Sequence, residues 1–120
     1  MRKALYDFLT TAGYRVYQPY SPLNTTVKPF VVVKFASPVE MNGGDFDVFE
    51  VWPYLSKGSF LLVDDMVDAL MALLDKATIT CLDGRRFCVE WMMTGPDFQD
   101  DALIALTRFL RFRVPARPAK

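Results

Sequence analysis

The run FVVVKFA at residues 30–36 constrains the fold more than any other part of the sequence. It is β-branched or aromatic at almost every position, so its apolar residues would occupy both faces of a strand. Such a run is typical of a central strand that is covered on both sides. The sequence therefore predicts a sheet with this strand in its interior.

Two other segments have the apolar spacing of amphipathic helices. In the first, apolar residues recur at i, i+3, i+4 and i+7, which predicts a helix over about residues 2–12, ended by Gly13 as a C-cap. The second covers about residues 59–76, with its aspartates away from the apolar stripe. The first stripe consists of Leu5, Phe8, Leu9 and Ala12, and the second of Val63, Met66, Val67, Leu70, Leu73 and Leu74.

Further strands are expected from apolar–polar alternation. Residues 102–107 fit a strand or a helix, so both remain open for that segment. The loops should lie at 19–29 and 37–45, which are rich in proline, glycine and other turn formers. We expect strands at 14–18, at 46–52 (stopped by Pro53), in a hairpin of 78–82 and 85–93 around Asp83-Gly84, and at 110–114.

These elements predict one α+β domain over residues 1–114, followed by a basic, proline-containing tail at 115–120. The domain should contain an antiparallel or mixed sheet of about five to six strands, with the two main helices packed on one face. At 120 residues, 52% of them apolar, the chain has room for a single core. No apolar run approaches the roughly 20 residues of a membrane span, and no secretory signal follows the basic start, so cytosolic synthesis is expected.

The predicted hairpin also bears on the two cysteines, Cys81 and Cys88. A tight Asp83-Gly84 turn would place both on the same face, directly opposite or diagonal according to register. That geometry allows a disulfide. Two buried thiols are the alternative, and they suit a chain without a signal peptide.

The sequence contains no histidine, which excludes Ser-His-Asp and Cys-His catalysis and every histidine-ligated metal site. The remaining candidate is WMMTGPDFQDD, with Asp97, Asp100 and Asp101 close together. Its spacing does not match a known calcium loop, and Asp97 after Gly95-Pro96 is a natural turn or N-cap residue. We interpret the stretch as a structural connection, and Asp64 and Asp68 of the second helix as part of a solvated face.

The charges are unevenly distributed although they sum to zero. Residues 40–75 contain eight acids and one base, whereas residues 108–120 contain five bases and no acid. Such a chain could attract copies of itself head to tail. RFLRFR could contact single-stranded nucleic acid, but a pI of about 6.2 argues against it. The many aromatic residues, together with six methionines, favour protein–protein contact, and hence an assembly protein over an enzyme.

Several stretches, taken in order, point to a family. They are TAGYRVY, PFVVVKF, FEVWPY, ALMALLD, TIT and GPDFQDDALIALTRFLRFRV. Together they resemble the tail terminator (tail completion, head–tail joining) proteins of long-tailed bacteriophages. Proteins of that family are small α+β subunits that form a ring, usually a hexamer, which caps the tail tube and docks to the head connector.

The resemblance implies a structural virion protein of the tail or neck, made in the host cytoplasm, with no enzymatic activity, cofactor or metal. Its implied partners are other copies of itself, the tail tube protein and the connector protein. It implies no membrane contact, and DNA contact only with a genome passing through the ring. The residues implied for ring and partner contacts are Met41, Asn42, Gly43 and Gly44 in an early loop and Arg111, Arg113 and Arg117 at the end.

We also expect Asp100 and Asp101 to be available to the arginines of a neighbouring subunit. The alternative function is a small cytosolic α+β domain or enzyme that binds a ligand or metal through the Asp97–Asp101 loop.

Overall fold

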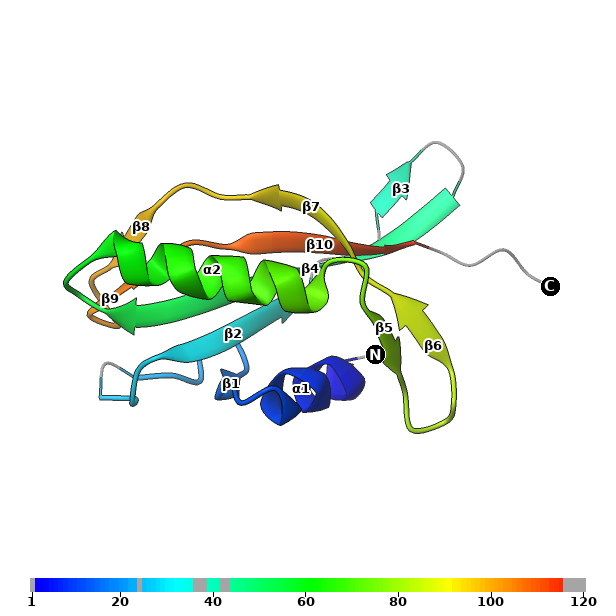
Figure 1. The fold of residues 1–120 in the computed structure, drawn as a ribbon, viewed down its shortest axis with the longest axis horizontal. Coiled ribbons are helices and arrows are strands. Elements are labelled where there is room, and N and C mark those ends of the chain that lie inside the picture. Colours follow the sequence, from blue (N-terminus) through cyan, green and yellow to red (C-terminus); the bar gives the residue numbers. More distant parts are fainter. Residues whose placement is uncertain (1, 24, 36–38, 42–43, 116–120) are drawn as a thin grey trace.

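The protein is described by a computed structural model that places residues 2–23, 25–35, 39–41 and 44–115. Within these residues it has two helices, α1 (Arg2–Thr11) and α2 (Phe60–Leu74), and ten strands (Figure 1). This confirms the α+β class. The strands are β1 (Val16–Tyr17), β2 (Phe30–Phe35), β3 (Val39–Met41), β4 (Gly44–Ser56), β5 (Thr78–Thr80), β6 (Arg86–Cys88), β7 (Glu90–Thr94), β8 (Phe98–Asp100), β9 (Ala105–Thr107) and β10 (Leu110–Pro115).

Eight of these strands form one sheet, somewhat more than the five to six expected. Five of them lie side by side in the order β1-β2-β4-β10-β7, and β2, the FVVVKF strand, is inside the sheet as predicted. β1 is parallel to β2, and the other described pairs are antiparallel. β3 and β9 pair with the two ends of β4, β8 pairs with β9, and β5 and β6 form a separate two-stranded sheet.

Both helices cover one face of the sheet, as predicted (Figure 1). The main core lies between the helices and this face, and the exposed fraction of every member is below one tenth. It includes Leu5, Leu9, Val31, Val33, Phe49, Val51, Val63, Leu70, Leu110 and Phe112. The opposite face, which we call the open face, holds a smaller buried cluster of Phe30, Val32, Tyr54 and Ala105.

Local signals explain where the helices end. At the end of α1, Gly13 has a φ of 102°, and the amide of Tyr14 donates to the carbonyl of Leu9 at 3.1 Å. This is the glycine C-cap that the sequence predicts. α2 begins after Ser59, whose hydroxyl accepts a hydrogen bond from the amide of Leu61 at 3.1 Å.

β4 corrects one prediction, because it runs through Pro53 instead of stopping there. The Thr107 hydroxyl donates to the Pro53 carbonyl at 2.6 Å, so the polar groups of Pro53 face the β9 side. On that side β10 pairs with β4 up to Val51, and β9 takes over at Tyr54. The N–H that proline lacks therefore falls at the change of partner, where no ladder bond is lost.

The segment expected as a loop at 37–45 contains strand as well. Val39–Met41 pairs with the start of β4, and Met41 is opposite Gly44. The hairpin of β3 and the start of β4 projects from the body of the molecule (Figure 1). Asn42 and Gly43 lie outside the described residues.

The predicted hairpin around Asp83-Gly84 exists, but its register differs. Cys81 donates its amide to Arg85 at 2.7 Å, and Gly84 (φ 88°) donates to Cys81, so three residues form the loop. A loop longer by one residue shifts the register, so Thr78 is opposite Cys88. Cys81, three residues beyond Thr78, therefore points to the other face. The expected same-face pair is wrong: both thiols are free, and Cys88 is exposed.

The predicted strand at 85–93 is divided at Val89 between two sheets. Val89 itself is buried, but Trp91 and Met93, which share its parity, are 43% and 39% exposed. Trp91 and Met93 are therefore not core residues of this strand. A register shift opposite Arg111 and Phe112 leaves Met92 as a bulge residue, which ends the simple alternation.

Residues 102–107, whose sequence fits either a strand or a helix, begin in a turn and end in a short strand. Residues 101–104 form the turn of the β8–β9 hairpin, and only Ala105–Thr107 are extended. None of the described helices is long and apolar enough to span a membrane.

Candidate interaction surface

The open face carries a connected group of charged, aromatic and sulfur-containing side chains. They come from β2, β4, β7 and β10 and from the residue before β10. We call them the open-face cluster: Lys34, Glu50, Trp52, Met93, Phe109 and Arg111.

Arg111 lies at the centre of this cluster. Its Nε and Nη2 both donate to Oε2 of Glu50, at 2.9 and 2.6 Å, and Nη1 lies 3.4 Å from the sulfur of Met93. The guanidinium carbon is 5.2 Å from the centre of the Phe109 ring. These contacts fix the orientation of a partly exposed guanidinium that would otherwise be mobile.

Trp52 links Arg111 to the next strand. Its Nε1 donates to Oε1 of Glu50 at 3.0 Å, and its ring centre lies 5.0 Å from that of Phe109. The ammonium of Lys34 lies 4.2 Å from the indole centre, a cation–π contact. The cluster is therefore a preorganised surface of residue types that are enriched at protein contacts.

The ion pairs within the chain change the expectation drawn from the charge distribution. Arg111 pairs with Glu50, and Arg113 pairs with Glu90 at 3.0 Å. Basic residues near the end of the chain thus pair with acids of the same molecule. Their electrostatic attraction to another copy of the chain is therefore reduced. Arg117 lies outside the described residues.

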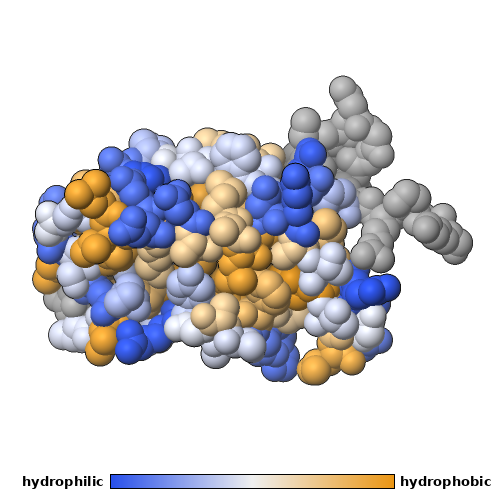
Figure 2. Space-filling view, in the orientation of Figure 1, coloured by the Kyte–Doolittle hydropathy of each residue, from blue (hydrophilic) through white to orange (hydrophobic). Residues whose placement is uncertain are grey.

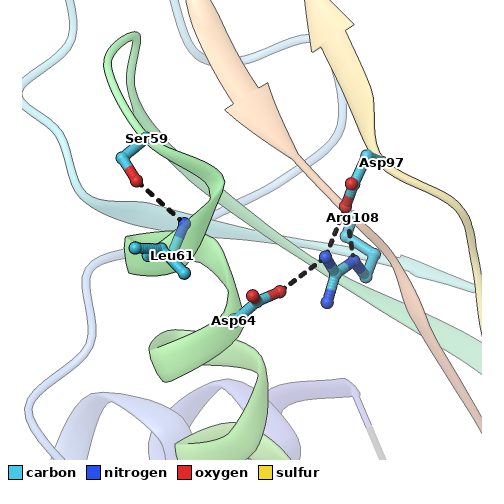
Figure 3. Close-up of polar contacts among 5 residues, drawn as sticks. All are labelled: Ser59, Leu61, Asp64, Asp97 and Arg108. Atoms are coloured by element: carbon cyan, nitrogen blue, oxygen red, sulfur yellow. Dashed lines mark hydrogen bonds and ion pairs between the residues drawn. The ribbon is translucent and has the colours of Figure 1, made fainter.

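Asp97 has a different role from the one its position after Gly95-Pro96 suggests. It accepts hydrogen bonds from Nε of Arg108, at 2.9 Å, and from Nη2, while Nη2 also pairs with Asp64 of α2 at 2.6 Å (Figure 3). The hydrogen bond to Asp97, and then that to Asp64, raises the pKa of Arg108. Arg108 therefore links α2 to the segment between β7 and β8. Asp64 takes part in this link, so the interpretation of Asp64 as part of a solvated face is incomplete.

The other two acids of the stretch also have separate partners. Asp100 accepts the amide of Leu103 at 3.0 Å and so takes the turn-capping role expected of Asp97. Asp101 accepts from Gln99 at 2.7 Å and from Lys57 at 3.2 Å, and these two contacts, in that order, lower its pKa. Because each acid is directed to its own partner, the stretch does not converge on a point where a metal could sit. Among the described residues no three side chains of the usual metal-ligand types gather.

Two features of this surface were missed in the sequence. One is the link from Trp52 through Glu50 to Arg111, although the i, i+2 spacing of Glu50 and Trp52 in a strand places both on one face. The other is Tyr54, which lies on the same face and lines a cavity beside Asp100. Nothing in the sequence indicates that the β8–β9 turn folds back over this end of the face.

The helix side has a second concave region. A groove of about 590 Å³ lies between α1, the end of α2 and β5, and Figure 2 shows apolar side chains gathered there. Its apolar lining residues are Ala4, Phe8, Ala12, Leu73, Ile79 and Leu82.

No protein-family model matches the chain, and no curated protein sequence matches it either. A solved structure of a protein that has no functional name has a similar fold. The alignment has a TM-score of 0.55 and 17% sequence identity, and it covers 98% of this chain and 95% of the other. At this identity the likeness shows the fold alone.

Proposed function

We propose that this chain is a structural subunit of a long-tailed bacteriophage, which forms a ring on the end of the tail tube and joins it to the head connector. The observation that carries the proposal is the projecting hairpin of β3 and the start of β4 (Figure 1). It contains Met41 and Gly44, and it corresponds to the early segment where the resembled family makes contacts between subunits.

The open-face cluster supports the same proposal. Arginine, methionine and aromatic residues held in fixed orientations reduce the entropy lost on binding. Ring formation requires two different patches on each subunit, since each interface joins unlike surfaces. The second patch is provided by exposed apolar residues near the start of α2 and the β8–β9 hairpin: Leu61, Leu62, Phe98 and Ile104, all at least 48% exposed.

Multi-angle light scattering and negative-stain imaging of the purified chain, with and without isolated tail tubes, test the proposal. We expect ring particles, either free or on the tube ends. The variant Leu61→Ser/Phe98→Ser should lower ring formation at least about tenfold, because it removes apolar contact area. Leu23→Ser is the matched control, since Leu23 is also exposed, at 66%, but lies in the loop before β2.

Two outcomes would contradict the proposal. One is a strict monomer at high concentration that also fails to bind tail tubes. The other is an equal loss of ring formation in the control and in the double variant. That result would show that Leu61 and Phe98 do not belong to a subunit interface.

A further inference from the structure

A cavity of about 340 Å³ opens on the open face, between the Tyr20–Pro22 segment and the β8–β9 turn. Its size lies within the range of small-ligand sites. The floor comes from β2 and β4 and the wall from the β8–β9 hairpin. Its main lining residues are Tyr20, Val32, Lys34, Tyr54, Asp100 and Leu103.

Tyr54 is the buried polar group of this cavity. It is 5% exposed, and its ring stacks on Phe30 with centres 5.1 Å apart. Its hydroxyl has no hydrogen-bond partner among the described residues, and it is accessible from the cavity although the rest of the side chain is buried. The hydroxyl is thus left to a group that enters the cavity.

Asp100 supplies a negative charge beside that hydroxyl. Burial and then the charge of Asp100 raise the pKa of Tyr54 to about 12, so the carboxylate acts on the tyrosine. One carboxylate oxygen of Asp100 accepts the Leu103 amide. Asp97 and Asp101 both form ion pairs, but Asp100 forms none with the described residues.

Lys34 is the cationic residue among the lining residues, and its ammonium is held over the Trp52 ring, 4.2 Å from the ring centre. Its ammonium is therefore engaged by the indole and does not neutralise Asp100. The cavity combines a carboxylate without an ion-pair partner, a hydroxyl that can accept, and the exposed ring of Tyr20 at its rim.

We propose that this cavity binds a cationic group, a guanidinium or primary ammonium, whose N–H groups donate to the Asp100 carboxylate and the Tyr54 hydroxyl. The exposed ring of Tyr20 lies where it can make a cation–π contact with that group. The cation comes either from a small organic molecule or from an arginine or lysine side chain of a partner chain. The binding site does not depend on ring formation.

Titration with methylguanidinium and ethylammonium, followed by NMR shifts of the Tyr54 and Leu103 amides, tests the proposal. Asp100→Asn should weaken binding at least about tenfold, because it removes the charge but keeps an oxygen for the Leu103 amide. The matched control is Asp101→Asn, which removes a neighbouring charge that pairs with Lys57, and should change affinity less than about twofold.

Lys34→Gln separates a cation site from an anion site. A cation should bind this variant as well as or better than the natural chain, since a like charge has been removed. Equal affinity of the Asp100→Asn variant and the natural chain, or loss of probe binding in Lys34→Gln, would overturn the proposal. An NMR fingerprint of each variant shows whether it is folded.

The two sources of the cation are distinguished by competition. If a partner side chain occupies the cavity, argininamide should weaken self-association or tube binding, and Asp100→Asn should reproduce that effect. If a small molecule occupies it, both should leave association unchanged while the probes still bind. Probe binding by a chain that forms no ring and does not bind tail tubes would contradict the proposed function and leave this inference intact.

Discussion

Arg108 joins two acids from different parts of the chain, Asp64 in α2 and Asp97 before β8. Its side chain is 18% exposed, whereas both carboxylates are nearly half exposed. Without the guanidinium the two like charges would face each other with no cation between them. We therefore expect Arg108→Ala to lower the free energy of unfolding by about 1–3 kcal/mol in urea denaturation.

Arg85→Ala is the control for this substitution. Arg85 pairs with Asp83 at 2.7 Å, but both side chains are more than half exposed, so water screens the pair. Its loss should leave the denaturation midpoint almost unchanged. If the two variants were destabilised equally, the link from Arg108 to Asp64 and Asp97 would contribute no more to stability than an exposed ion pair.

Tyr54 makes the stability of the fold depend on alkaline pH. Its pKa is raised to about 12 in the folded chain by burial and the charge of Asp100, whereas the unfolded tyrosine titrates near about 10. Above about pH 10 the tyrosine of the unfolded state loses its proton first. The contribution of Tyr54 to stability is therefore fully present below about pH 10 and is lost between about pH 10 and 12. We expect a loss of roughly 2–3 kcal/mol across that range.

Urea titrations at several pH values would measure this loss, and Tyr54→Phe should remove most of it because phenylalanine carries no titratable group. A slope that persists in Tyr54→Phe would assign the loss to other groups, such as Tyr14, whose pKa is also raised by burial.

At the scale of elements, β7 and the start of β10 meet at Gly95. Its amide donates to the Phe109 carbonyl at 2.8 Å, and a methyl group on Gly95 would lie 2.2 Å from Cε1 of Phe109. The ring cannot move freely, since Trp52 lies 5.0 Å from it. Gly95→Ala should therefore cost about 1–3 kcal/mol and change the tryptophan fluorescence.

A double-mutant cycle tests the cause of that cost. In a Phe109→Leu background the alanine has more space, so its cost should fall by at least about 0.5 kcal/mol. An equal cost in both backgrounds would mean that the Phe109 ring is not what the alanine meets.

Periodic elements were predictable from the sequence because their signals are local. The stripe of Val63, Val67 and Leu70 fixes α2, and Gly13 fixes the end of α1. Leu110, Phe112 and Val114 are buried in strict alternation, as their spacing predicts.

The errors arose where a distant partner decides the outcome. Pro53 remains in β4 because β9 replaces β10 beside it. Trp91 is exposed although it lies opposite the buried Phe112, because β7 is the edge strand beside β10. The Asp83-Gly84 loop was one residue longer than its sequence suggested, which moved Cys81 to the other face. The cavity at Asp100 depends on the β8–β9 hairpin, whose turn lay in the segment left open.

At the scale of the whole molecule, the acidic middle and basic end of the chain meet within one fold. The pairs Arg108–Asp64 and Arg111–Glu50 join these two regions directly. An assembly of such subunits should rest on apolar contact more than on net charge attraction. We expect its dissociation constant to change less than about tenfold between about 50 and 500 mM NaCl, as measured by light scattering.

Asp101→Lys is the companion test of this prediction. It reverses the charge of a residue that pairs with Lys57 in the same chain. If association of the natural chain weakened steeply with added salt, and association of Asp101→Lys did not, the prediction would be wrong. That result would show that acids of this turn contact the arginines of a neighbouring subunit.

β4 has a further consequence for how the chain is made. Along most of its length its neighbours are β2, which precedes it, and β10, at residues 110–115. While the chain leaves the ribosome, β2 and β4 can pair early, but one long edge of β4 stays without a partner until those late residues emerge. An unpaired apolar edge is a place where nascent chains associate wrongly. The growing chain therefore passes through a period in which a chaperone could protect it, and this period ends when β10 is added.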